Sequence, residues 1–295
     1  MSINAPVHYG IQFANTMALL LQQKSSKLES YVTSRGGYTG KSASPVDQVG
    51  LVEMQAVNGR FEAMPRVDAP LARRWVDPQD FDLPQLVDLF DKLREVQDPT
   101  SSLAQAAVAA ANRQKDRLII AAFFGTAKTG EQGATSTTFP AADQIAQNFG
   151  ASANVNLTVA KVLEGRKKLM AHQVDVEADE IICAVTASQY DSLLHEAQFI
   201  SSDFNGTKPL TDGRVGRYLG VTFVHCELLT TDTSGYRRVP MWAKSGMHLA
   251  KWMDVTSSVS QRNDLRGEPW QLYLKMTMGA TRLEEGRVIE IKCAE

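Results

Sequence analysis

Apolar residues recur at helical spacing in several segments of the chain, and these segments predict its helices. The first covers residues 11–30, and the Gly36, Gly37 and Gly40 stretch then breaks the pattern. Further helices are predicted over residues 84–96, 157–173 and 187–195. The longest runs from Ser101 to Phe124 without Gly or Pro, with Asp98 and Pro99 before it and Gly125 after it.

Strands are predicted in two parts of the chain. Within residues 46–80, Val52, Met54 and Ala56 alternate with polar residues, and Asn58-Gly59 is a strong hairpin signal. This hairpin has few large apolar residues, so it is either mobile or completed by a neighbouring molecule. The other strands are predicted over 180–185, 220–226, 239–242, 270–278 and 287–291, with a turn at 232–235.

The order of these elements indicates a layered fold that mixes helices and strands. Residues 125–156 are rich in Gly, Thr, Ser, Ala and Asn and predict a loop or linker. The first helix, followed by glycines, fits an arm that packs outside its own core. It fits a plain first helix of a globular domain equally well.

Composition excludes several classes of protein. The net charge is −2 over 295 residues, without the basic surplus of a protein that wraps nucleic acid. The three cysteines are widely spaced, which disfavours disulfides and zinc and predicts buried thiols. The longest apolar run, 118–124, is too short for a membrane span, and residues 1–10 do not resemble a secretion signal.

A search for catalytic and ligand-binding motifs finds none. Gly40-Lys41-Ser42 resembles the end of a phosphate-binding loop, but Arg35 stands where that motif needs glycine. The loop from Gly125 to Gly130 follows a helix, whereas phosphate loops precede one. No histidine pair has metal-ligand spacing, and Glu284-Glu285 predicts an ion-paired turn between strands. We therefore expect no catalytic residue, cofactor or metal.

Short stretches in a fixed order carry a family resemblance. They lie at 7–13, 20–23, 98–101, 119–122, 125–127, 158–161, 185–189, 218–223, 242–246 and 279–285. Together the chain resembles the major capsid proteins of tailed bacteriophages, which have the HK97-type fold.

This resemblance implies an α+β architecture with the following parts. Residues 1–45 would be the N-terminal arm, 46–80 the extended loop with its β-hairpin, and 81–150 the peripheral domain with the long spine helix. Residues 151–250 would be the axial domain, and 251–295 strands that return to the peripheral domain.

The resemblance also implies a function. Copies of the chain would self-assemble as hexamers and pentamers into an icosahedral head around double-stranded DNA. The protein would be made in the bacterial cytoplasm and end in the virion, without contact with a membrane. A portal protein would be a partner. Many relatives begin with a helical scaffolding segment, but here the arm motif starts within ten residues of Met1, so we expect a separate scaffolding protein.

The predicted hairpin carries the candidate contacts between subunits. Its arginines are Arg60, Arg66, Arg73 and Arg74. We expect them to pair with acidic groups of neighbouring copies.

Two alternatives remain open at the level of sequence. An encapsulin-like compartment would share the fold and store cargo enzymes, and neighbouring terminase and portal genes would distinguish the two. A soluble α/β enzyme using a glycine-rich loop would stay monomeric, whereas a capsid protein forms capsomers, shells or tubes visible by negative-stain microscopy.

Overall fold

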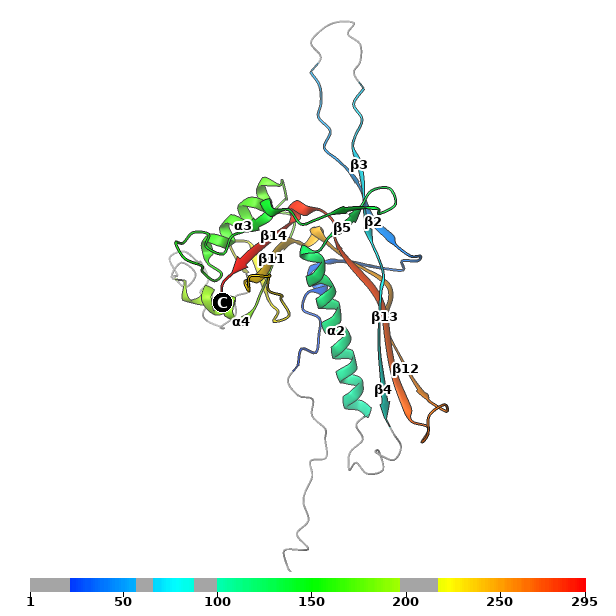
Figure 1. Ribbon diagram of the computed structural model, residues 1–295. Coiled ribbons are helices and arrows are strands. Elements are labelled where there is room, and N and C mark those ends of the chain that lie inside the picture. The colour runs from blue at the N-terminus through cyan, green and yellow to red at the C-terminus, as the bar shows by residue number, and fades with distance from the viewer. Residues whose placement is uncertain (1–21, 57–65, 88–99, 197–216) are drawn as a thin grey trace, which may run out of the picture. The chain divides into compact units, whose positions relative to one another are not determined.

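The computed structural model describes residues 22–56, 66–87, 100–196 and 217–295. The chain divides into two units (Figure 1). Unit 1 comprises Met1–Ser25, Asp80–Arg113 and Asp254–Met276, and unit 2 comprises Ser26–Gln79, Gln114–Met253 and Thr277–Glu295. Helix α2 (Thr100–Phe124) and strands β12 (Met247–Gln261) and β13 (Trp270–Arg282) continue from one unit into the other.

Unit 1 is built on the first half of α2 and a sheet of β4 (Gln79–Val87), β13 and β12. Small alanine side chains in this half of the helix, Ala104, Ala107 and Ala111, let it pack closely on the sheet. Ala107 is buried against Leu272 and Leu274 of β13, with Leu83 of β4 and Val255 of β12 beside them.

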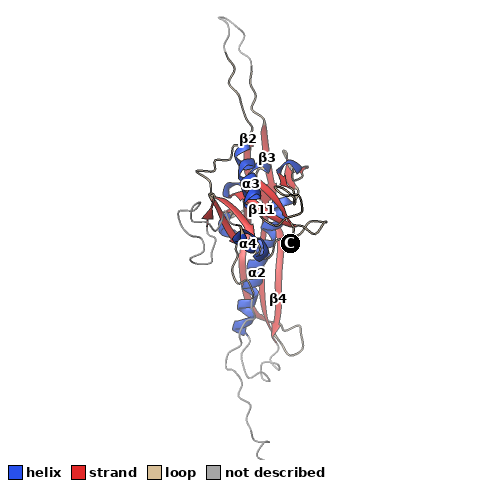
Figure 2. Cartoon of the chain, turned by 90° about the vertical axis from the view of Figure 1, so that its left-hand side faces the viewer, coloured by secondary structure: helices blue, strands red, loops and turns tan. Residues whose placement is uncertain are grey.

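Unit 2 contains the main core, around a six-stranded mixed sheet. The strand order is β7 (Gln144–Ile145), β14 (Val288–Cys293), β11 (Arg237–Ala243), β8 (Ile181–Val185), β10 (Val221–His225) and β9 (Arg217–Tyr218). All residues of β8 are buried, as expected for a central strand covered on both faces. The helices α3 (Val159–Ala171) and α4 (Ala187–His195) lie on the side that faces the viewer in Figure 2. The second half of α2 adds Phe123, whose ring packs 4.6 Å from that of Trp242.

Buried polar groups fix the irregular parts of unit 2. The ammonium of Lys161, on α3, is fully buried and donates to the carbonyls of Gln147, Val155 and Lys292 at 2.7–2.9 Å. Burial lowers its pKa. Because three carbonyls satisfy all three donors, one side chain joins α3, the preceding loop and β14.

The three cysteines are buried and unpaired, as the sequence predicted. Burial raises the pKa of Cys226 to about 11 and that of Cys293 to about 12, and it raises the pKa of Cys183 further. None of these thiols is therefore ionised near neutral pH.

The remaining short elements flank the sheets. They are the 3₁₀ turns η2 (Glu29–Tyr31), η3 (Ala141–Asp143), η4 (Lys244–Gly246) and η5 (Glu285–Arg287), and the strands β1 (Thr33–Gly36), β2 (Ala43–Val49), β3 (Leu71–Val76), β5 (Ala127–Thr129) and β6 (Thr135–Thr137).

Several predicted elements are confirmed. These are the long helix, α3, α4, the buried strand β8, the C-terminal strands and the turn at 232–235. Strand β12 was not predicted. It runs from the buried core to an exposed end, so its pattern follows no single period.

The predicted helix over 11–30 is wrong in its described part. Residues 22–28 form no helix, and only η2 follows them. The buried carboxylate of Asp116 on α2 accepts the backbone N–H groups of Lys27 and Leu28 and the Ser26 hydroxyl. The backbone N–H groups that bind Asp116 are therefore not available for the hydrogen bonds of a helix. Residues 11–21 lie outside the described residues.

The predicted helix over 84–96 is also wrong where it is described, because residues 84–87 belong to β4. Phe81, Leu83, Gln85 and Val87 alternate with more exposed residues, and Pro84 lies on an edge strand, where a missing N–H is tolerated. Residues 88–96, Asp98 and Pro99 lie outside the described residues.

The predicted linker over 125–156 contains regular structure. It forms β5, β6, η3 and β7. Strand β5 gains its hydrogen bonds from β3, which lies far away in sequence, so local composition could not reveal it.

The predicted strand around Val52–Ala56 is wrong, because residues 51–56 form no strand. The hairpin itself is present, but its paired strands are β2 and β3, on either side of this segment. Asn58-Gly59 lies outside the described residues.

His248 generates a prediction about pH. It is buried on β12, and its ring nitrogens contact the hydroxyls of Thr33 at 3.1 Å and Tyr38 at 3.0 Å. Burial, with the nearby charge of Arg35, lowers its pKa from 6.5 to about 4. The unfolded chain thus takes up a proton below pH 6.5 that the folded chain takes up only near pH 4. Stability from this group is complete above 6.5 and is lost as the pH falls towards 4.

When the pH is lowered from 6.5 to 4, we expect the unfolding free energy of the wild-type subunit to decrease. The decrease should exceed that of the His248→Gln variant by up to roughly 3 kcal/mol. Urea unfolding at a series of pH values measures both. Parallel pH curves for the two proteins would contradict this assignment.

Candidate functional site

The base of the long hairpin is a second sheet of unit 2, with strand order β2-β3-β5-β6. β2 and β3 are antiparallel, with Val49 opposite Leu71, and the Gly50 N–H donates to the Pro70 carbonyl at 2.6 Å. β2 and β3 lead into the hairpin, coloured blue and cyan in Figure 1. The connection between these strands, residues 50–70, is therefore much longer than a tight turn.

The hairpin and its strands expose large apolar side chains. The exposed residues are Val46, Val49, Leu51, Val52, Met54, Val67 and Leu71. Met54 is fully exposed and Leu71 is 79% exposed. A cluster of exposed apolar side chains on a projecting segment indicates a surface that binds another molecule.

Two of the candidate arginines form exposed ion pairs at this site. Arg66 pairs with Asp68 at 2.8 Å, and Arg73 on β3 pairs with Asp47 on β2 at 2.6 Å. The Arg73 guanidinium also lies 5.7 Å from the Trp75 ring centre, and it lowers the pKa of Asp47. Water screens such pairs, so their side chains remain available to a partner. Arg60 lies outside the described residues.

Arg74 has a different environment, on the opposite face of β3. Its side chain is only 5% exposed and makes a two-pronged ion pair with Glu285, both bonds at 2.8 Å. The structure thus brings Arg73 and Arg74 onto one strand but turns them apart, as adjacent strand residues must be. The guanidinium of Arg74 is engaged within its own chain.

Glu285 also lies 3.7 Å from Arg282, whose side chain is fully buried at the end of β13. Arg282 donates to the carbonyls of Phe123 at 2.7 Å and Gly125 at 3.0 Å, and its guanidinium lies 5.2 Å from the Phe139 ring. It therefore caps the C-terminus of α2, where free carbonyls favour a cation. Burial lowers its pKa.

The predicted ion-paired turn at Glu284-Glu285 is confirmed. Glu284 pairs locally with Arg287 at 2.5 Å, as the charged turn indicated. The partner Arg74 lies 211 positions from Glu285, and no signal in the sequence connects the two.

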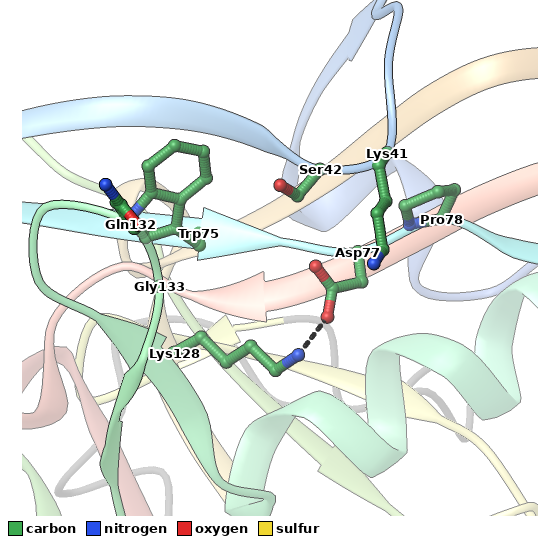
Figure 3. A pocket seen from close by; sticks show the side chains of 8 residues that line it. All are labelled: Lys41, Ser42, Trp75, Asp77, Pro78, Lys128, Gln132 and Gly133. Carbon is green, nitrogen blue, oxygen red and sulfur yellow. Dashed lines mark hydrogen bonds and ion pairs between the residues drawn. The ribbon is translucent and has the colours of Figure 1, made fainter.

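A cavity of about 480 Å³ opens beside this sheet (Figure 3). It is lined by Lys41, Ser42, Trp75, Asp77, Pro78, Lys128, Gln132 and Gly133. Lys128 pairs with Asp77, and the Trp75 indole N–H donates to the Gly130 carbonyl at 2.7 Å. Gly133, with φ +72°, lies so close to the indole that a Cβ would be 3.1 Å from the ring. The tryptophan wall is therefore held in place by the β5–β6 turn.

The two glycine-rich stretches flagged in the sequence lie at this sheet, one just before it and one partly within it. Gly40-Lys41-Ser42 precedes strand β2 instead of a helix, and Ala127–Thr129 forms β5. Neither has the geometry of a phosphate loop at a helix N-terminus. Within the described ranges, no group of three or more His, Cys, Asp or Glu side chains is placed to bind a metal. No helix among those residues is long and apolar enough to span a bilayer.

Comparison with known proteins identifies the family. The family described as phage capsid protein matches residues 5–295. The chain belongs to the phage capsid protein family. Membership implies a structural role for this capsid protein, as a component of the virion shell. No curated protein sequence matches it.

Solved capsid structures share its fold. The capsid protein of the cyanophage P-SCSP1u is 17% identical, with a TM-score of 0.75; the match covers 98% of the present chain and 94% of the P-SCSP1u chain. The capsid protein of the cyanophage Pam1 is 11% identical, with a TM-score of 0.75; the match covers 98% of the present chain and 97% of the Pam1 chain. The head protein of the Helicobacter pylori bacteriophage KHP40 is 11% identical, with a TM-score of 0.73; the match covers 99% of the present chain and 98% of the KHP40 chain. The capsid protein therefore has the α+β HK97-type fold that its sequence indicated.

The buried cluster of Arg74, Arg282 and Glu285 generates a prediction about stability. Glu285→Ala would leave two buried guanidinium groups without their carboxylate. We expect this change to cost about 3–5 kcal/mol of unfolding free energy, measured by urea denaturation.

Glu284→Ala is the matched control. It breaks the neighbouring, more exposed pair with Arg287 and should cost no more than about 1 kcal/mol. Equal losses in the two variants would contradict a special role for the buried cluster.

Proposed function

We propose that this capsid protein gathers into hexamers and pentamers that tile the icosahedral head of a tailed bacteriophage around double-stranded DNA. The exposed apolar hairpin carries this proposal. Burying one large apolar side chain contributes roughly 1.5–3 kcal/mol, and the hairpin can gain this only from another molecule. A contact between hairpin and body, repeated by rotation, closes a ring of subunits.

The division of the chain follows the same proposal. The arm comprises residues 1–45, the extended loop 46–80, the peripheral domain 81–150 and the axial domain 151–250, with residues 251–295 returning to the peripheral domain. Two features support it: residues 22–28 are held by side-chain contacts instead of regular structure, and the β2–β3 hairpin falls largely within 46–80.

We propose further partners of the shell. A separate scaffolding protein would set its size, a portal protein would occupy one vertex, and assembly would occur in the host cytoplasm. The DNA would be enclosed and not tightly wrapped, because the chain has a net charge of −2.

That hairpin arginines contact neighbouring subunits also remains a proposal. The environments of the arginines reduce the number of candidates. Arg66 and Arg73 are exposed on the hairpin and can exchange their own carboxylates for those of a neighbour. Arg60 stays a candidate from sequence. Arg74 acts instead within the subunit, through Glu285.

Removing the hairpin tests the proposed function. Residues 51–70 can be replaced by Asn-Gly-Thr, because the Gly50 N–H already donates to the carbonyl at position 70 and a threonine in place of Pro70 supplies the N–H that a two-residue turn needs. We expect the variant to keep the thermal unfolding midpoint of the wild type and to form no shells, capsomers or tubes. Negative-stain microscopy and sedimentation velocity measure this. Shells in wild-type yield would contradict the proposal, as would a wild-type chain that remains monomeric at every concentration.

Charge reversal tests the arginine contacts separately. We expect Arg66→Glu combined with Arg73→Glu to reduce the yield of particles while changing the unfolding free energy by no more than about 1 kcal/mol, because both native pairs are exposed. Lys167→Glu, an exposed reversal on α3, provides the comparison. A particle yield equal to that of the wild type would eliminate these contacts.

A further inference from the structure

The cavity at the hairpin base has more positive than negative charge. Two of its lining residues are lysines, Lys41 and Lys128, and one is an acid, Asp77. Lys128 is already paired with Asp77, whereas Lys41 makes no hydrogen bond or ion pair with the described residues. Figure 3 shows both lysine side chains directed towards Asp77, Lys41 from the segment before β2 and Lys128 from β5. The cavity can therefore accept one further negative charge.

The wall beside these charges is apolar and rigid. The Trp75 indole is fixed by its hydrogen bond to the Gly130 carbonyl and by contact with Gly133, and Pro78 lines the cavity as well. A fitting ligand thus combines a carboxylate with adjacent apolar groups.

One segment of the capsid protein itself has this chemistry. Glu53 is exposed, makes no hydrogen bond or ion pair with the described residues, and is flanked by exposed Val52 and Met54. The other described acids of the hairpin are occupied, Asp47 by Arg73 and Asp68 by Arg66. Among the described residues of the hairpin, Glu53 is therefore the acid that has no partner.

Glu53 is carried away from the cavity of its own chain. The cavity includes Ser42, next to the start of β2, and β2 runs from Ala43 to Val49 before the chain continues to Glu53. Paired strand rises about 3.3 Å per residue, so the seven steps from Ala43 to Gly50 alone span about 23 Å. The cavity of its own chain is therefore out of reach of Glu53, and a Glu53 side chain that enters such a cavity must belong to another copy.

We propose that the cavity at the hairpin base receives the Glu53 side chain of a neighbouring copy of this chain. Glu53 pairs there with Lys41 and Lys128, and Val52 or Met54 packs against the Trp75 wall. The contact joins two different surfaces, so each subunit gives one hairpin and accepts another, as a closed ring requires. This inference rests on the proposed assembly and specifies its contact.

A charge swap tests the contact. Glu53→Lys should reduce particle yield at least about tenfold, and so should Lys41→Glu, because each places like charges together. The double variant Glu53→Lys/Lys41→Glu should restore most of the yield. Glu177→Lys, another exposed glutamate, should assemble normally, and all variants should keep the wild-type unfolding midpoint.

Disulfide trapping provides a second measurement on assembled particles. With Glu53→Cys and Lys41→Cys in one chain, mild oxidation should give a ladder of linked subunits on a non-reducing gel. The native cysteines are buried and add no background. The pair Glu177→Cys and Lys41→Cys should give none.

The outcomes separate this contact from the proposed function. Wild-type yield from Glu53→Lys, no rescue in the double variant, or no ladder in assembled particles would overturn the contact and leave the shell-forming role intact. If the wild-type chain formed no assemblies, both proposals would be overturned.

Discussion

Unit 2 depends on the contacts of one buried group, the guanidinium of Arg282. Arg282 is the last residue of β13. Its guanidinium donates to the carbonyls at the end of α2 and shares Glu285 with Arg74 of the hairpin strand β3. A buried charge is costly unless several groups compensate it together. Here a carboxylate, a helix C-terminus and an aromatic ring do so, which ties elements distant in sequence to one position.

This cluster explains how a long, exposed hairpin can still be directed. A projecting strand pair with little core of its own would otherwise pivot at its base. Arg74 anchors β3 from its buried face, while Gly279 of β13 lies so close to the carbonyl of Asp77 that a Cβ would be 2.3 Å from it. The opposite face, with Arg73 and Trp75, stays available for a neighbouring molecule. Of two adjacent residues on one strand, Arg74 thereby stabilises the subunit and Arg73 is exposed for a contact with a neighbour.

The elements that the sequence predicted are those whose signal is local. The long helix, α3, α4 and β8 each carry their periodicity within one segment. The errors arose where a distant group decides the local structure. Asp116 takes the backbone donors of residues 26–28, and β3 turns Ala127–Thr129 into a strand. Among the candidate arginines, pattern could not separate Arg73 from Arg74, because the partner that distinguishes them, Glu285, lies near the other end of the chain. The cavity was missed for the same reason: Lys41, Trp75 and Lys128 come from three separate segments.

The burial of all three thiols has a consequence for the life of a virion. Cys183, Cys226 and Cys293 are enclosed in the core and remain protonated at neutral pH, so the folded subunit offers no reactive thiol at its surface. Subunits of a virion shell cannot be joined by disulfides through these cysteines unless the core first opens to expose one.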